Sequence, residues 1–330
     1  MSPPSPRLRP VAERRRVLLG GFGALAALAA GPAAFRALAE ERGRRAATRA
    51  GLAFGTTVSL TLVADGSDRF EPAFRDAFSA IRAVEAAGSL FQPESALSRL
   101  NRDGTLATPD PLLLDMLRFA LTLAERSGGA FDPTVQPLWT LWSEATAKGE
   151  RPGPSARAEA VARVGWRHVR VEETGIHFDR PGMGVTLNGL IQGFAADQVM
   201  AALKAHGIAD AFVDTGEFGA SGAHVDGSPW RLGLAAHGDD AMSDVIAPFT
   251  GFAATSGDDA TTFSPDRRDH HIFDPATGLS PTALSRVTVT APSGLLADGL
   301  STAAFVMGAQ AGQALIQLYS GCSARFTAKV

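Results

Sequence analysis

Two oxygen-bearing side chains near the end of the chain, Asp298 and Thr302, have the spacing of a metal site. If this apolar segment is a helix, residues four apart share one face, so the carboxylate and the hydroxyl point the same way. Such oxygens suit Mg²⁺, which keeps other coordination positions for water and substrate phosphate. The alternative is structural, since an aspartate here can cap the start of the helix, and the spacing alone favours the cap.

A second candidate site is the run from Asp269 to Asp274, which contains the adjacent histidines His270 and His271. We expect this run to be a short strand followed by a turn over 274–278. Side chains alternate along a strand, so only one of the two histidines can face a given site. The alternative is a pair of structural histidines at a sheet edge, and adjacent histidines do not give zinc the converging ligands that it requires.

Two glycine-containing segments have the character of ligand-binding turns. In 127–134, glycines allow the backbone to approach a ligand, Phe131 can pack on a ring system, and Asp132 can accept hydrogen bonds from ring or ribose donors. The segment 186–197 is expected to join a strand to the start of a helix, whose first N–H groups favour phosphate. Alone, the first segment is also typical of a helix end, and the second lacks the spacing of the standard phosphate loops.

Hydrophobic spacing predicts the elements that position these groups. Apolar residues at helical spacing predict helices over 70–87, 111–127, 155–164, 190–206, 297–307 and 311–319. Alternating and β-branched segments predict strands over 54–64, 211–214, 230–235, 245–249, 287–291 and 324–330, and a hairpin over 168–178. Because strands and helices do not alternate regularly, we expect an α+β fold, a single compact domain with mixed or antiparallel sheets flanked by helices.

Composition excludes several classes of protein. The 330 residues are 45% hydrophobic, enough for a substantial core, and their net charge of −3 gives no basic surplus that would favour nucleic acid. The single cysteine, Cys322, excludes a disulfide framework or a thiolate metal cluster within the chain.

Residues 1–39 are predicted to be an export signal of the twin-arginine type. Arg14–Arg16 precede an apolar run over 17–30, and Ala37-Leu38-Ala39 fits a cleavage site. The run is shorter than the ~20 residues of a membrane span, although an uncleaved anchor helix is the alternative. No cysteine follows the run, so we do not expect a lipoprotein. We therefore expect a periplasmic protein whose working domain is 40–330.

Taken together and in order, these segments resemble the FAD:protein FMN transferase (ApbE) family. The matching motifs are Gly55-Thr56-Thr57, FQPESALSRLN from Phe91, GGAFDPTV, LNGLIQGFAAD, VDTGEFGASG, ATSGDD, HHIFDPATG and ADGLST. They cover essentially the whole mature chain. The resemblance implies an α+β, T-fold-related domain. It also implies a periplasmic setting and Mg²⁺-dependent transfer of FMN from FAD to a threonine hydroxyl of a partner protein, with release of AMP.

The resemblance also assigns roles to residues of this chain. It implies that Asp298 and Thr302 hold Mg²⁺ with the backbone carbonyl of Gly189. It places His271 near the transferring phosphate, as an acid/base or charge-stabilising group. The residues that would line the FAD are Ala130, Phe131, Asp132 and Ile272. Under this interpretation the cap becomes the minor role of Asp298, although one carboxylate can do both.

The flavin-contacting positions depart most from the family pattern. Phe54 replaces a methionine, Phe91 replaces a tyrosine, and Thr186 replaces an aspartate. Gln192 replaces a lysine, Glu217 replaces a glycine, and Asp259 replaces a tyrosine. Gln192 can form hydrogen bonds but offers no positive charge. One branch of the family, the NosX-like accessory protein of the nitrous oxide reductase operon, is resembled by the combination of Leu187-Asn188-Gly-x-x-Gln192-Gly193 with Asp214-x-Gly216-Glu217.

The expected partner is a flavin-acceptor protein, bound to the membrane with a periplasmic domain. The family's acceptor sequence runs roughly D-G-x-x-x-A-T; the similar run from Asp298 has Ala304 where the acceptor hydroxyl belongs, so we do not expect self-modification. Two alternatives remain open. One is an FAD pyrophosphatase that gives FMN and AMP by attack of water, and the other is a non-catalytic FAD-binding assembly factor.

Overall fold

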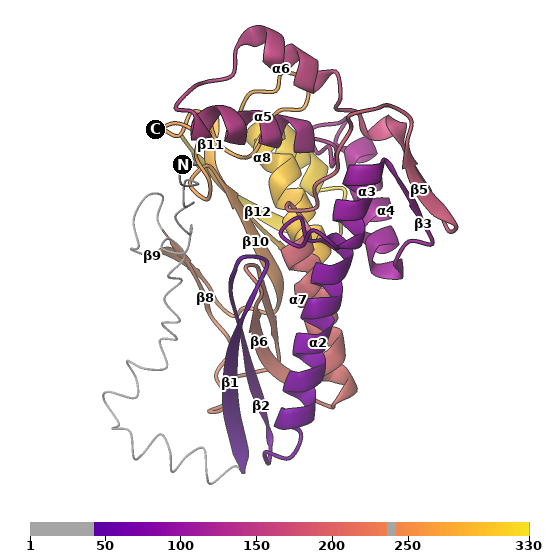
Figure 1. Ribbon diagram of the computed structural model, residues 1–330. Coiled ribbons are helices and arrows are strands. Elements are labelled where there is room, and N and C mark those ends of the chain that lie inside the picture. Colours follow the sequence, from indigo (N-terminus) through magenta and orange to yellow (C-terminus); the bar gives the residue numbers. More distant parts are fainter. Residues whose placement is uncertain (1–42, 236–241, 330) are drawn as a thin grey trace, which may run out of the picture.

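The computed structural model describes residues 43–235 and 242–329, so the predicted export signal lies outside the described residues. The centre of the protein is a seven-stranded sheet in which every neighbouring pair of strands is antiparallel (Figure 1). In spatial order the strands are β1 (Arg44–Ala53), β2 (Thr56–Asp65), β6 (Asp210–Asp214), β7 (Phe218–Ser221), β10 (Gly251–Gly257), β11 (Leu284–Ala291) and β12 (Ser323–Ala328).

The first hairpin turns on two residues between β1 and β2. Phe54 and Gly55 both have positive φ, 52° and 73°, and this geometry matches the twist of the two strands. The strand predicted from residue 54 is confirmed as β2, beginning after the turn. The sequence did not predict β1, because most of its side chains are exposed and it lacks an apolar face.

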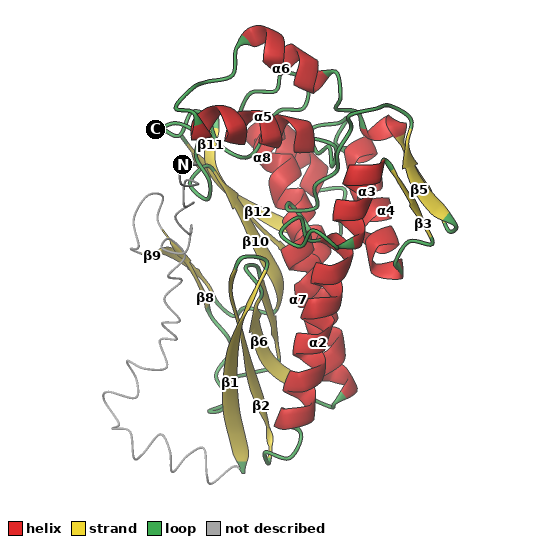
Figure 2. Cartoon of the chain, viewed as in Figure 1, coloured by secondary structure: helices red, strands yellow, loops and turns green. Residues whose placement is uncertain are grey.

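Three long helices lie against one face of the sheet: α2 (Phe70–Gly88), α7 (Ile191–Ala205) and α8 (Gly294–Ile316) (Figures 1 and 2). The main core lies between these helices and the strands, and alternate residues of β2 such as Leu60 and Leu62 enter it. Val63 points the other way, into a second core under the small sheet of β8 (Leu232–Ala235) and β9 (Met242–Ile246).

Four further helices complete the helical part of the described chain: α3 (Ala96–Asp103), α4 (Pro111–Arg126), α5 (Gln136–Ala147) and α6 (Pro154–Val161). A second small sheet has the order β3 (Thr105–Ala107), β5 (Gly175–Phe178), β4 (Val169–Glu172), which confirms the predicted hairpin, and the 3₁₀ turn η1 (Trp166–His168) precedes it. The two helices predicted near the end are one element, α8, broken by non-helical backbone at Gly308.

The α+β class with antiparallel sheets is confirmed, and two local predictions are wrong. The strand predicted over 245–249 is β9, which ends at Ile246 before Pro248, a residue with no N–H for a sheet ladder. The strand predicted around His270 is instead part of the long loop 258–283 between β10 and β11, with one isolated bridge from His270 to Thr262. No helix among the described residues is long and apolar enough to cross a membrane.

Candidate functional site

Helix α8 begins at a cap that does not involve Asp298. Ser293 occupies the N-cap position and accepts from the Leu296 N–H. The carboxylate of Asp197 on α7 accepts from the Gly294 N–H at 2.7 Å and the Leu295 N–H at 2.8 Å. Burial raises the pKa of Asp197, although these hydrogen bonds oppose the shift. The first turn is therefore satisfied without Asp298, and the cap proposed for that residue from its spacing is wrong.

Asp298 lies one turn further along, where α8 meets α7 at Gly193. A Cβ on Gly193 would be 2.1 Å from the Gly294 carbonyl oxygen, so only glycine allows the helices to come this close. The Gly193 N–H donates to Oδ2 of Asp298 at 3.0 Å. The Asp298 side chain, 5% exposed, is thus held in a fixed direction by the helix crossing.

The three residues predicted to hold a metal ion lie on neighbouring elements. Asp298 and Thr302 share α8, and a Cβ on Gly189 would be 3.0 Å from Oγ1 of Thr302 and 3.5 Å from the ring of Phe131. Space beside the Thr302 hydroxyl therefore exists because residue 189 has no side chain. Carboxylate, hydroxyl and carbonyl form the hard-oxygen donor set that suits Mg²⁺, so these residues fit that ion.

Such an ion would depend on its other ligands coming from water and substrate. Among residues 43–235 and 242–329, no group of three or more His, Cys, Asp or Glu side chains is placed to hold a metal. A site with one carboxylate is typical of Mg²⁺ that binds together with phosphate oxygens.

The carboxylate of Asp132 is used within the protein. Its Oδ1 accepts from the N–H and the hydroxyl of Thr134 at 2.8 and 2.6 Å, and its Oδ2 accepts from the Trp166 N–H at 3.1 Å. Burial raises the pKa of Asp132 while these bonds oppose the rise. Asp132 thereby fixes the turn that carries the half-buried Ala130 and the buried Phe131, whose ring contacts the position of Gly189.

A hydrogen bond joins the two glycine-containing segments. The Thr186 N–H donates to the Pro133 carbonyl at 2.7 Å, and the Thr186 hydroxyl accepts from the Asn188 N–H at 3.2 Å. The side chain of Asn101 bonds both backbone groups of Val185 at 2.7 Å. These contacts give the turn before α7 a defined shape next to Phe131.

The two phenylalanines assigned to the flavin differ in exposure. Phe54 is 7% exposed and packs in the main core, with its N–H donating to Glu85 at 2.7 Å. Phe91 is 67% exposed, and its ring would lie 3.9 Å from a Cβ at Gly55. Phe91 is therefore an exposed ring beside the hairpin turn, whereas the side chain of Phe54, a residue of the turn itself, is buried in the main core.

Gln192 packs against the turn between β6 and β7. Its Nε2 lies 1.9 Å from where a Cβ of Gly216 would be, so a side chain there would displace the Gln192 amide, and the φ of 98° at Gly216 favours glycine. The Thr215 hydroxyl donates to the Gln192 carbonyl at 2.8 Å. Glu217 is 7% exposed and accepts from the Thr255 N–H of β10 at 3.0 Å.

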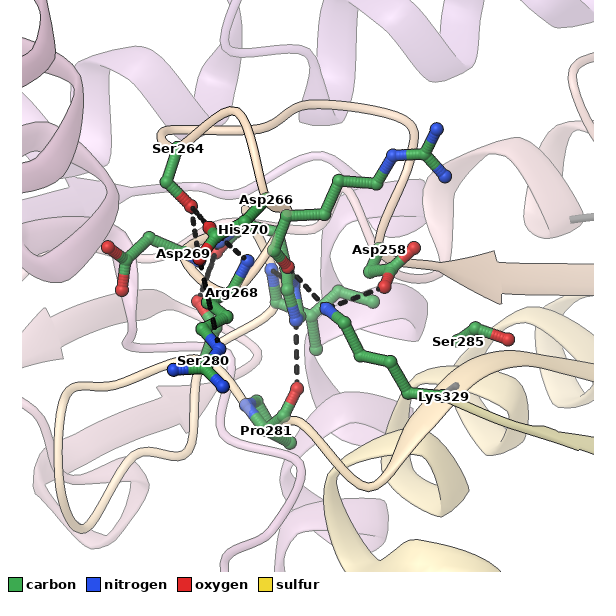
Figure 3. Close-up of polar contacts among 12 residues, drawn as sticks. Asp258, Ser264, Asp266, Arg268, Asp269, His270, Ser280, Pro281, Ser285 and Lys329 are labelled. Atoms are coloured by element: carbon green, nitrogen blue, oxygen red, sulfur yellow. Dashed lines mark hydrogen bonds and ion pairs between the residues drawn. The ribbon is translucent and has the colours of Figure 1, made fainter. Parts of the chain in front are cut away.

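His270 is a structural residue of the loop 258–283 (Figure 3). It is fully buried; Nε2 donates to the Pro281 carbonyl at 2.9 Å, and Nδ1 accepts from the Ile272 N–H at 3.3 Å. One donor and one acceptor define a neutral ring, and burial lowers the pKa of His270. Beside it, Lys329 reaches from the end of β12 to the buried Asp258, with Nζ 2.8 Å from Oδ2 (Figure 3).

His271 is half-buried on the same loop, next to the buried Ile272. Its Nδ1 lies 3.2 Å from the Thr261 carbonyl oxygen, which can only accept, so Nδ1 donates to it. When such a ring is neutral, its lone pair is on Nε2, where an imidazole accepts a proton.

Sequence reasoning did not identify Ser256 as a site residue. Its hydroxyl lies 3.0 Å from Oγ1 of Thr302 and 2.8 Å from Oγ of Ser301. The segment 251–257 has no alternating pattern and was not predicted as a strand, so nothing local indicated that β10 runs beside α8.

Comparison with known proteins agrees with this arrangement. The model of the ApbE family matches residues 54–326. The FAD:protein FMN transferases of Treponema pallidum and Haemophilus influenzae are each 31% identical, over 77% and 78% of this chain and 76% and 80% of their own. The structure of the flavin transferase ApbE from Vibrio cholerae aligns with a TM-score of 0.75 at 25% identity, covering 87% of this chain and 97% of that one. The flavinyl transferase ApbE from Pseudomonas stutzeri gives 0.74 at 28%, covering 87% and 92%. The chain belongs to the ApbE family.

Proposed function

We propose that this protein is a flavin transferase that moves FMN from FAD to a threonine hydroxyl of a partner protein and releases AMP. The observation that carries the proposal is the grouping of Asp298, Thr302 and Gly189 beside the ring of Phe131. Relatives that share most of the length of this chain are named FAD:protein FMN transferases. A hard-oxygen site next to an aromatic wall suits a substrate with a pyrophosphate and a flavin.

The reaction is a phosphoryl transfer. The threonine oxygen bonds to the phosphorus of the FMN half, the bond from that phosphorus to the bridging oxygen breaks, and AMP leaves with that oxygen. The threonine proton passes to a base, for which Nε2 of His271 has the required lone pair. Mg²⁺ held by Asp298, Thr302 and the Gly189 carbonyl would neutralise charge on the pyrophosphate. The chain's own contribution is to fix these groups before substrate binds.

The flavin half of the site would use Phe91, Phe131 and Ile272 as apolar surfaces. Phe91 is exposed and available for ring stacking. Gln192 provides a neutral amide where a lysine would supply a positive charge. Neutralising the negative charge of the phosphates would then depend on the metal ion. Asp132 supports this wall from within the protein.

The test is covalent labelling of an acceptor domain that carries the sequence D-G-x-x-x-A-T. With FAD and Mg²⁺ the acceptor should become fluorescent in a denaturing gel, and an acceptor with valine in place of its threonine should stay dark. Asp298→Asn should abolish labelling, whereas Asp103→Asn, an exposed carboxylate paired with Arg102, should not change it. AMP release at full rate without acceptor would instead identify a pyrophosphatase. FAD that binds and stays intact with acceptor and Mg²⁺ would identify a carrier.

We also propose export by the twin-arginine route and action on a membrane-bound acceptor with a periplasmic domain. The support is the Arg14–Arg16 run before the apolar segment 17–30. The Gln192-Gly193 and Gly216-Glu217 pairs support a role in maturing a flavoprotein associated with nitrous oxide reductase. Replacing Arg14 and Arg15 by lysine should retain the protein in the cytoplasm, and unchanged export would contradict the route.

A further inference from the structure

Three hydroxyl groups form a continuous row between β10 and α8. Oγ of Ser256 lies 2.8 Å from Oγ of Ser301 and 3.0 Å from Oγ1 of Thr302. Ser301 is fully buried, Ser256 is 9% exposed, and Thr302 is half-buried at the end of the row. Buried hydroxyls are almost always hydrogen-bonded, so the direction of each O–H bond is determined by its neighbours.

The direction of the row is fixed at its inner end. Oγ of Ser301 lies 2.9 Å from the carbonyl oxygen of Asp298, one turn earlier in the same helix. A carbonyl oxygen has no hydrogen and can only accept, so Ser301 donates its single hydrogen there. Ser301 therefore accepts from Ser256. Because Ser256 has now used its own hydrogen, it accepts from Thr302.

This order determines what Thr302 presents to the site. Its hydrogen points to Ser256, away from the space beside Gly189, and its lone pairs are left for a ligand. A neutral hydroxyl binds a cation through a lone pair, and a hydrogen turned toward the ion opposes binding. The row thus prepares Thr302 for a cation before the cation arrives.

We propose that Ser256 is a positioning residue that sets the direction of the Thr302 O–H bond for a hard divalent cation at Asp298, Thr302 and Gly189. The inference rests on the proposed function, because that function places the cation there. Partners of metal ligands commonly act in this way, by orienting the ligand and fixing its proton.

The position of Ser256 is itself held from both sides of its strand. Ser256 pairs with Val287 of β11. On the other edge, pairing of β10 with β7 ends at Ala253, and the Glu217 carboxylate accepts the next available N–H, that of Thr255, at 3.0 Å. Glu217 thus extends the contact between the strands up to the residue before Ser256.

The chain offers a matched control on the opposite face of β10. Thr255 also forms a hydroxyl pair, with Thr288 of β11 at 2.9 Å. Thr255→Val removes a hydroxyl from the same strand and breaks a bond of similar length, but this bond belongs to no row that ends at Thr302. It reports the effect of losing a hydroxyl pair in this sheet without changing the Thr302 hydroxyl.

The experiment is a titration of the full-length protein with Mn²⁺ alone, in which free Mn²⁺ is measured by electron paramagnetic resonance. The wild type should bind one ion and Asp298→Asn none. Ser256→Ala should bind about tenfold more weakly, the lower end of the effect seen for partners of metal ligands. Thr255→Val should bind like the wild type.

A second variant tests the direction of the row. In Ser301→Ala, Ser256 loses the acceptor of its hydrogen, which is then free to turn toward Thr302. In that orientation Ser256 donates to Thr302, and Thr302 cannot donate to Ser256. Mn²⁺ binding should weaken although Ser301 lies one hydroxyl away from Thr302. If Ser256→Ala or Ser301→Ala binds as tightly as the wild type, or if the wild type binds no ion, the inference is wrong. If Mn²⁺ binding follows the prediction while no acceptor is labelled, the transferase proposal fails and the inference stands.

Discussion

Removing either partner of the ion pair between Lys329 and Asp258 should destabilise the protein strongly. Asp258 is fully buried and the Lys329 side chain is 15% exposed, with Nζ 2.8 Å from Oδ2. Lys329 also donates to the Arg267 carbonyl inside the loop 258–283. One lysine at the end of β12 therefore joins the start and the middle of the loop that carries His271.

Lys329→Met keeps the length of the side chain and removes its charge. Removing one partner of a buried pair typically costs about 3–5 kcal/mol, because the other charge remains buried without that cation. We expect the lower part of this range, since Lys329 retains some contact with water. At roughly 2 °C per kcal/mol for a domain of this size, the melting temperature should fall by roughly 6–8 °C.

The assay is urea unfolding of four proteins, the wild type, Lys329→Met, Asp258→Asn and the double variant, with Lys204→Met as the control. Lys204 is exposed on α7, so its replacement should change the free energy of unfolding by less than about 0.5 kcal/mol. The double variant should be more stable than the sum of the two single losses implies, because it leaves neither charge behind. Additive losses, or a loss below about 1 kcal/mol in Lys329→Met, would refute the reasoning.

Three further predictions concern the loop, the helix crossing and the flavin half of the site. The pKa of His270 is lowered in the folded state, so its contribution to stability is present above about pH 6.5 and is lost as pH falls. The difference in free energy of unfolding between the wild type and His270→Gln should therefore shrink below that pH. A difference that does not change with pH would contradict this prediction. Gly193→Ala should lower stability by about 1–3 kcal/mol or more through its clash with the Gly294 carbonyl, whereas Gly153→Ala, in open space, should be neutral by thermal unfolding. Gln192→Lys should reduce the Mg²⁺ concentration needed for half-maximal labelling, and an unchanged requirement would exclude a charge role for residue 192.

The helices were predictable because the spacing of the apolar residues within each segment shows which face is buried. In α2, Phe74, Ile81 and Val84 recur at helical spacing and all three are buried. α5 was missed because only Leu138 and Trp142 of its twelve residues are buried, too few to form a pattern. Elements whose burial depends on distant parts of the chain therefore escape prediction from periodicity.

The sequence predicted the residue types of the site but not the hydrogen bonds that these residues form with distant parts of the chain. The spacing of Asp298 and Thr302 correctly placed both oxygens on one helix, but it could not exclude the cap. That decision came from Asp197, about a hundred positions earlier in the chain, whose carboxylate accepts from the first N–H groups of α8. The strand predicted around His270 failed for a similar reason, because Ser280 and Pro281 provide hydrogen-bond partners that hold the segment as a loop.

The two halves of the site differ in how strongly the fold constrains them. At the metal half, Gly193 has no room for a side chain, Asp298 is oriented by the Gly193 N–H, and Thr302 by a row of buried hydroxyls. A side chain at Gly193 would therefore alter the contact between α7 and α8. At the flavin half, Phe91 is largely exposed and makes few demands on the core. Replacing Phe91 should therefore cost little stability, whereas the buried Phe54 and the Gln192 amide packed on Gly216 tie the rest of this half to the fold.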